Sequence, residues 1–114
     1  MGYSVSFLRS AEKFLDSLEP KLAAKAFREM GLLAHFGPQL AFPHAKKIVG
    51  TTNLHELRVK QGNNICRLFY FFLGNNIYVV ISGYIKKTDK TDPDQINRAI
   101  RLMNEYLEEN DEQG

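Results

Sequence analysis

Arginine and lysine side chains recur through residues 54–93, and these are the residues of the chain best suited to chemistry. The set comprises Arg58, Arg67, Lys86, Lys87 and Lys90. Cations of this kind, without a metal ion or a nucleophilic side chain, suit the cleavage of RNA by its own 2′-hydroxyl group. Such a catalyst orients that hydroxyl, neutralises the charge that develops on the phosphate and protonates the leaving oxygen. We therefore look for a phosphate-handling site among these residues.

The proton acceptor of such a reaction can be a lysine or a histidine, and the sequence leaves this choice open. A lysine would need neighbouring positive charge to lower its pKa. Of the three histidines, only His44, which follows Pro43 and precedes Lys46, is placed near a candidate site. The histidines have no metal-ligand spacing with each other or with Cys66, and no phosphate-binding glycine loop or nucleophile elbow is present. We expect no metal and no cofactor.

Three strand-like runs, separated by two Gly-Asn-Asn turns, must position these cations. Residues 62–64 and 74–76 tolerate the positive φ of tight hairpin turns, and the runs are rich in Val, Ile, Phe and Tyr. We predict a three-stranded antiparallel meander. Alternation along the first run places Glu56, Arg58 and Lys60 on a solvated face, and the side chains between them toward covering helices.

The middle run is apolar on both sides apart from Arg67, which predicts a central strand. An arginine in such a run is costly unless it is paired or lies at an open cleft. Two interpretations remain open. Arg67 forms an ion pair with Glu56 of the adjacent strand, or it forms an anion site on the open face of the sheet.

A lysine cluster, Lys86, Lys87 and Lys90, leaves the third strand just before the last helix. Charge runs at strand exits are most often solvated, and this interpretation also remains open. The alternative rests on convergence, because three bases on consecutive strands can meet at one patch. Tyr84 would join that patch, and its ring could stack on an RNA base.

Helices flank the meander on both sides in the sequence. Residues 3–8 alternate weakly, which predicts a first strand, and Ser10 is the expected N-cap of a short helix. Pro20 fits the first turn of a second helix, and the two helices form a hairpin that packs on the sheet. Residues 39–53 have no clear periodicity and are predicted to form an ordered loop with a basic segment. Asp92, followed by Pro93, is expected to start and cap the final helix.

Length and composition fit one α+β domain over residues 1–114. A single cysteine favours a cytoplasmic protein, and no apolar run has the length of a membrane span. The formal charge of +2 hides an uneven distribution. Residues 105–114 hold five acids and no base, which leaves 15 bases against eight acids on residues 1–104. A basic body of this kind is typical of proteins that bind polyanions.

Three motifs together carry a resemblance to a known family. They are L-H-E-L-R at residues 54–58, C-R-L-F-Y-F-F at 66–72 and G-Y-I-K-K-T-D-K-T at 83–91. This order resembles the HigB branch of the RelE-like toxins, which includes the phage-derived Gp49-like proteins. The match is densest over residues 54–100. In many relatives Lys-Thr runs directly into Pro, whereas Asp92 intervenes here.

The resemblance implies a fold, an activity and partners. The fold is that of a small microbial-ribonuclease-like α+β domain with helices on one face of an antiparallel sheet. The activity is that of a metal-independent endoribonuclease that cuts mRNA in the ribosomal A site. The partner is a HigA-like helix-turn-helix antitoxin, which forms a hetero-oligomeric complex with the toxin. The implied catalytic residues are Arg58, Arg67 and Lys86, and the expected RNA-binding residues are Lys46, Lys47, Tyr84, Lys87 and Lys90.

Two other classes of function use the same basic residues. A non-catalytic RNA- or ribosome-binding module would need the positive patch and Tyr84, but no group placed for proton transfer. A structural partner in a complex would need only a basic docking surface for an acidic chain.

Overall fold

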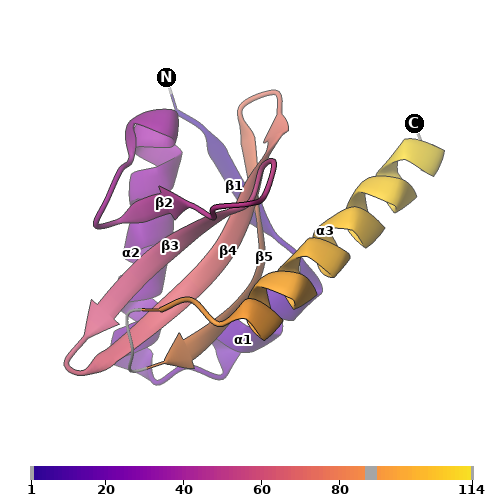
Figure 1. Ribbon diagram of the computed structural model, residues 1–114. Helices are drawn as coiled ribbons and strands as arrows, with labels where there is room; N and C mark the ends of the chain where they lie inside the picture. The colour runs from indigo at the N-terminus through magenta and orange to yellow at the C-terminus, as the bar shows by residue number, and fades with distance from the viewer. Residues whose placement is uncertain (1, 87–89, 114) are drawn as a thin grey trace.

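A five-stranded mixed sheet forms the centre of the protein, whose computed structural model describes residues 2–86 and 90–113 (Figure 1). The strands lie in the order β1-β5-β4-β3-β2. β1 runs parallel to β5, and the other neighbouring pairs are antiparallel. The α+β class is therefore confirmed, and the sheet is mixed because the first strand joins its far edge in parallel. The strands are β1 (Ser4–Phe7), β2 (Ala45–Lys47), β3 (His55–Gln61), β4 (Asn64–Gly74) and β5 (Ile77–Lys86).

The predicted meander consists of β3, β4 and β5, and both Gly-Asn-Asn turns form. Gly62, between β3 and β4, has a φ of 59°. Asn75 and Asn76, between β4 and β5, have φ values of 52° and 61°. Two consecutive residues of positive φ form the kind of turn whose twist matches that of the strands it joins. These turns fix the register in which the cations of the three strands meet.

Two helices, α1 (Arg9–Asp16) and α2 (Pro20–Phe36), cover one face of the sheet, and a short 3₁₀ turn (Gly37–Gln39) follows them. Pro20 is the first residue of α2, as predicted. The expected capping role of Ser10 is wrong, because Ser10 lies inside α1 and its hydroxyl donates to the Ile81 carbonyl at 2.5 Å. The core on this side comprises Ala11, Leu15, Leu18, Leu22, Ala26, Met30, Leu33, Ala45, Leu57, Val59, Cys66, Leu68, Tyr70, Tyr78 and Val80.

The final helix, α3 (Pro93–Gln113), crosses the opposite face (Figure 1). Its start is as predicted, since Asp92 Oδ1 accepts the backbone N–H of Asp94 at 2.9 Å. The expectation that all helices cover one face is wrong, because an apolar stripe along α3 packs on side chains such as Phe69 and Phe71. The predicted solvated position of Glu56 is wrong for the same reason, and this residue is 0% exposed.

A short strand, β2, occupies part of the segment predicted as a loop. It pairs with β3 over three residues, from Ala45 opposite Leu57 to Lys47 opposite His55. The remaining edge of β3, residues 58–61, extends beyond this pairing. No helix among the described residues has the length and apolar character needed to cross a membrane.

Candidate functional site

The register of the meander brings the predicted site residues of three strands into two neighbouring rows. In the first row, Arg58 of β3 lies opposite Arg67 of β4, and Arg67 lies opposite Tyr84 of β5. The second row lies two residues away along each strand. It runs from Lys60 of β3 through Ile65 of β4 to Lys86 of β5. Residues directly opposite each other in antiparallel strands have Cα atoms about 4.5–5.5 Å apart. The convergence expected from the sequence is therefore present in the backbone.

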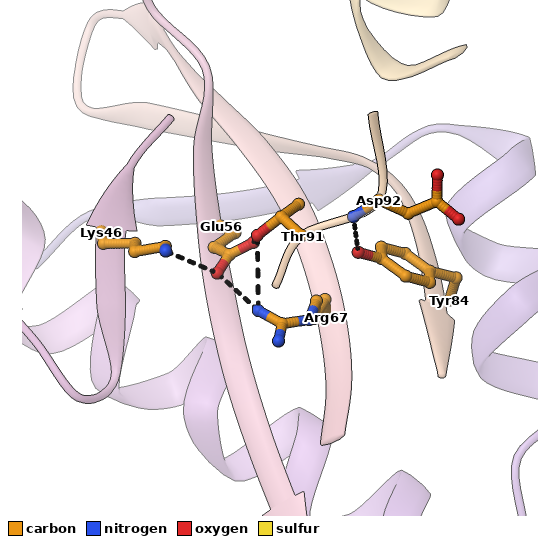
Figure 2. A network of polar contacts seen from close by, with 6 residues as sticks. All are labelled: Lys46, Glu56, Arg67, Tyr84, Thr91 and Asp92. Carbon is orange, nitrogen blue, oxygen red and sulfur yellow. Dashed lines mark hydrogen bonds and ion pairs between the residues drawn. The ribbon is translucent and has the colours of Figure 1, made fainter. Parts of the chain in front are cut away.

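Arg67 lies at the centre of a buried polar network (Figure 2). Its Nη1 atom donates to Glu56 Oε1 at 2.8 Å and to the Thr91 hydroxyl at 3.4 Å. Thr91 donates in turn to Glu56 Oε2 at 2.8 Å. Lys46 Nζ approaches the same carboxylate at 3.8 Å. The ion pair between Arg67 and Glu56, one of the two interpretations that the sequence left open, is thus what the structure contains.

Both partners of this ion pair are 0% exposed. Arg67 therefore presents no surface to a phosphate in this conformation. Thr91, which is partly buried, joins the pair to the segment that leads into α3. The network consequently fixes the start of α3 against the middle of the sheet.

Tyr84 and Lys86 meet at Asp92 on the same side of the sheet. The hydroxyl oxygen of Tyr84 accepts the backbone N–H of Asp92 at 2.7 Å (Figure 2). Lys86 Nζ lies 3.8 Å from Asp92 Oδ2, with about a third of each side chain exposed. One face of the Tyr84 ring stacks on Phe69, with a centroid distance of 5.9 Å and an interplanar angle of 20°. Burial raises the pKa of Tyr84, so its hydroxyl stays protonated near neutral pH.

Three of the predicted RNA-binding lysines gather at one cleft of about 330 Å³ between the β2 segment and the start of α3. Its polar lining comprises Lys46, Lys47, Lys90 and Thr91, and its apolar lining comprises Ile48, Val49 and Ile96. Because Lys90 lies more than 40 residues after Lys46 and Lys47 in the sequence, the fold itself produces this positive cleft. Lys87, which was predicted with them, lies outside the described residues.

A second cleft, of about 300 Å³, opens at the edge of β3 that β2 leaves uncovered. It is lined by Glu29, Pro43, His44, Arg58, Lys60 and Ile65. His44 Nδ1 lies 3.0 Å from Glu29 Oε2 and 3.2 Å from Oε1. The guanidinium of Arg58 lies over the Phe42 ring, 5.6 Å from its centroid. Arg58 therefore belongs both to the row of bases on the sheet and to this cleft.

Sequence reasoning named His44 but missed Glu29, its partner. The two residues are 15 positions apart, in α2 and in the loop before β2, and neither segment has a motif that relates them. Thr91 and Asp92 were likewise not assigned to the site. In the sequence, a hydroxyl and a carboxylate beside a lysine cluster do not indicate a site. Their contacts exist only in the folded chain, where this segment lies over β4 and β5.

Other groups of chemical interest lie away from these clefts. Among the described residues, no set of three His, Cys, Asp or Glu side chains is placed to hold a metal ion. Cys66 is buried in β4, and burial raises the pKa of its thiol to about 12. This thiol is therefore a core side chain rather than a nucleophile.

Comparison with known proteins supplies a family and a fold. The sequence profile of the family described as phage-derived protein Gp49-like (DUF891) matches residues 13–104. No curated protein sequence matches the chain significantly. Among solved structures, a variant of the toxin RelE from E. coli in its free state is similar, with a TM-score of 0.59 and 18% identity. That match covers 73% of this chain and 82% of the other.

Two solved complexes, one of them described as a toxin–antitoxin complex, contain similar chains. The RelBE2 complex of Mycobacterium tuberculosis gives a TM-score of 0.57 at 18% identity, covering 75% of this chain and 100% of the other. The archaeal RelE–RelB complex of Pyrococcus horikoshii gives 0.53 at 17%, covering 80% and 100%. At identities this low, the structural matches establish the fold alone. The family match, in contrast, spans most of the sequence. The chain therefore belongs to the phage-derived Gp49-like family, and its fold is that of the RelE-like toxins.

Proposed function

We propose that this protein is the toxin of a type II toxin–antitoxin system, a metal-independent endoribonuclease that cleaves mRNA in the ribosomal A site. Residues 1–114 would act as one toxin domain in the cytoplasm. One observation carries the proposal. Strand register aligns Arg58, Arg67 and Tyr84 in one row with Lys86 beside it, and a cleft lined by three lysines adjoins the buried end of the same network.

The chemistry divides between the exposed and the buried bases. Arg58 and Lys86 have exposed surface, and they would neutralise the phosphate as charge develops during attack by the 2′-hydroxyl. Arg67 would act through its ion pair, because it holds Glu56 and Thr91 and thereby the segment before α3. Arg67 is thus proposed as a positioning residue in the conformation described here.

The lysines would hold the RNA backbone on either side of the scissile bond. Lys46, Lys47 and Lys90 line one cleft, and we assign Lys87 to the same role on the resemblance alone. Phosphate contacts of this kind fix the register of the RNA, while the ring of Tyr84, which is partly exposed, would offer a surface for a base.

The proposed partner is a HigA-like antitoxin with a helix-turn-helix domain, bound in a hetero-oligomeric complex. The similar chains from M. tuberculosis and P. horikoshii were each solved in a toxin–antitoxin or RelE–RelB complex. These complexes support an antitoxin as the partner. The HigA-like type rests on the sequence resemblance.

Induced expression in a bacterial host tests the proposal, with growth and primer extension on an abundant message as readouts. Wild-type protein should arrest growth and leave cuts in register with the codons. Lys86→Met should relieve the arrest, whereas Lys13→Met, a matched change on α1 at the opposite face, should not. Continued growth with folded wild-type protein at a high level would contradict the proposal.

A non-catalytic RNA- or ribosome-binding module remains the second candidate, and the burial of Arg67 favours it. Arg67 is 0% exposed and paired with Glu56, so in this conformation it does not reach a phosphate, and a binding module needs no such contact. This candidate predicts protein that sediments with ribosomes, inhibits translation and leaves the message uncut.

A further inference from the structure

The cleft at the open edge of β3 contains a carboxylate–imidazole pair beside two cations. Glu29 comes from α2, His44 from the loop before β2, and Arg58 and Lys60 from β3. Neither the row of bases on the sheet nor the lysine cleft includes the first two residues. The proposed phosphate chemistry therefore assigns no role to the Glu29–His44 pair.

His44 is held in place by three separate contacts. Its backbone N–H donates to the Ala41 carbonyl at 3.0 Å, and its carbonyl accepts the backbone N–H of Arg58 at 2.8 Å. Its ring Nδ1 is engaged with the Glu29 carboxylate at 3.0 Å. Since Nδ1 is taken, Nε2 is the ring nitrogen that can exchange a proton with a ligand. The backbone bond also fixes the imidazole relative to Arg58.

The imidazole of His44 is more exposed to solvent than the carboxylate of Glu29. The Glu29 side chain is 16% exposed, whereas that of His44 is 45% exposed. A carboxylate that is mostly buried and an imidazole that reaches the cleft form the usual arrangement of an orienting group and a proton-transfer group.

We propose that His44, oriented by Glu29, is the general base of the endoribonuclease proposed above, and that Arg58 binds the scissile phosphate next to it. The inference rests on that proposed function and adds the group that accepts the proton. Arg58 links the two sites, because it lines the cleft and also lies opposite Arg67 on the neighbouring strand.

The proposed step is balanced without any further reagent. Neutral His44 takes the proton of the RNA 2′-hydroxyl at Nε2, and the 2′-oxygen forms a bond to phosphorus. The bond from phosphorus to the 5′-oxygen breaks, and that oxygen takes a proton from water. The products are a 2′,3′-cyclic phosphate and a 5′-hydroxyl end, and His44 then releases its proton to solvent.

Charged groups from two elements surround the His44 imidazole. Glu29 faces the imidazole from α2, and Arg58 and Lys60 face the cleft from β3. Lys25 and Arg28 of α2 line an adjoining recess together with His44.

Single-turnover cleavage of mRNA on programmed ribosomes tests the inference. His44→Gln should slow cleavage by about a hundredfold or more, as loss of a general base typically does. The matched control is His35→Gln, because His35 is exposed on α2 and lies outside both clefts. Its cleavage rate should equal that of the wild type. Binding of His44→Gln to ribosomes should also be unchanged.

Chemical rescue separates a catalytic role from a structural one. In His44→Gly, added imidazole should restore cleavage in proportion to its concentration of free base, and the product should still carry a 2′,3′-cyclic phosphate. Equal rates for wild type and His44→Gln would overturn the inference while leaving the endoribonuclease intact. A folded His44→Gly that imidazole does not rescue would also overturn it. An uncut message with wild-type protein would instead remove the function on which the inference rests.

Discussion

Arg67 and Glu56 combine full burial with opposite charge, and this determines what a substitution there will do. Their charged atoms lie 2.8 Å apart, and neither side chain has exposed surface. Removing one partner of a buried ion pair leaves the other charge uncompensated and costs about 3–5 kcal/mol. Replacing both partners with apolar side chains of similar size is often close to neutral. The fold therefore depends more on the pairing than on either charge.

Arg67→Ala should accordingly lower the free energy of unfolding by about 3 kcal/mol or more, because the Glu56 carboxylate is left buried without its partner. Urea denaturation followed by circular dichroism measures this change. The double variant Glu56→Leu with Arg67→Met should recover most of the loss. A midpoint for Arg67→Ala equal to that of the wild type would show that the buried pair does not exist in solution.

Cys66 allows a prediction about pH. Burial raises the pKa of its thiol from 9.0 to about 12, so the folded state keeps the proton that the unfolded state loses. The stabilisation is complete below pH 9 and is lost as the pH rises from 9 toward 12. Alkylation by iodoacetamide at pH 9 should thus be slow in native protein and fast in urea. Cys66→Ala should show a smaller loss of stability over this range, and rapid alkylation of native protein would contradict the burial.

Packing between α1 and β5 is close. A Cβ atom on Gly83 would lie 2.6 Å from the ring of Phe14 and 2.8 Å from Leu68. Gly31, by contrast, lies in α2 with nothing within 4 Å of the same position. The two glycines therefore form a matched pair, in which the same added methyl group meets a packed sheet in one case and solvent in the other.

Gly83→Ala should lower the free energy of unfolding by about 1–3 kcal/mol, since α1 must shift to admit the methyl group. Gly31→Ala should raise it by up to about 1 kcal/mol, because alanine is the better helix former. Thermal unfolding of both variants measures the difference. A stabilised Gly83→Ala protein would mean that α1 does not lie against β5 as described.

Elements with strong local signals were predictable from the sequence, and the remainder depended on pairing across the chain. Pro20, the Gly-Asn-Asn turns and Asp92 each act on backbone within a few residues, Asp92 through its side-chain carboxylate, so α2, the meander and α3 were expected. β2 has three residues and no periodicity, and its existence depends on β3. The side of the sheet that α3 covers, and with it the burial of Glu56 and Arg67, depends on tertiary packing alone. The Glu29–His44 pair could not be predicted either, because it also depends on tertiary packing.

The whole molecule places helices on both faces of the sheet and leaves charged clefts at its margins. α1 and α2 bury one face, and α3 buries part of the other (Figure 1). The lysine cleft lies where the start of α3 meets β2, and the Glu29–His44 cleft lies where β2 begins beside β3. Arg58 is the residue that connects the second cleft with the row of bases.

The decisive experiment is cleavage of mRNA by purified protein, on ribosomes programmed with a defined codon in the A site and on the same message free in solution. A ribosome-dependent endoribonuclease should cut at the A-site codon on the ribosome, leave a 2′,3′-cyclic phosphate at the new end and cleave little of the free message. Protein that binds programmed ribosomes and leaves the message whole would contradict the proposed function. Equal cleavage of free and ribosome-bound message would contradict the dependence on the ribosome.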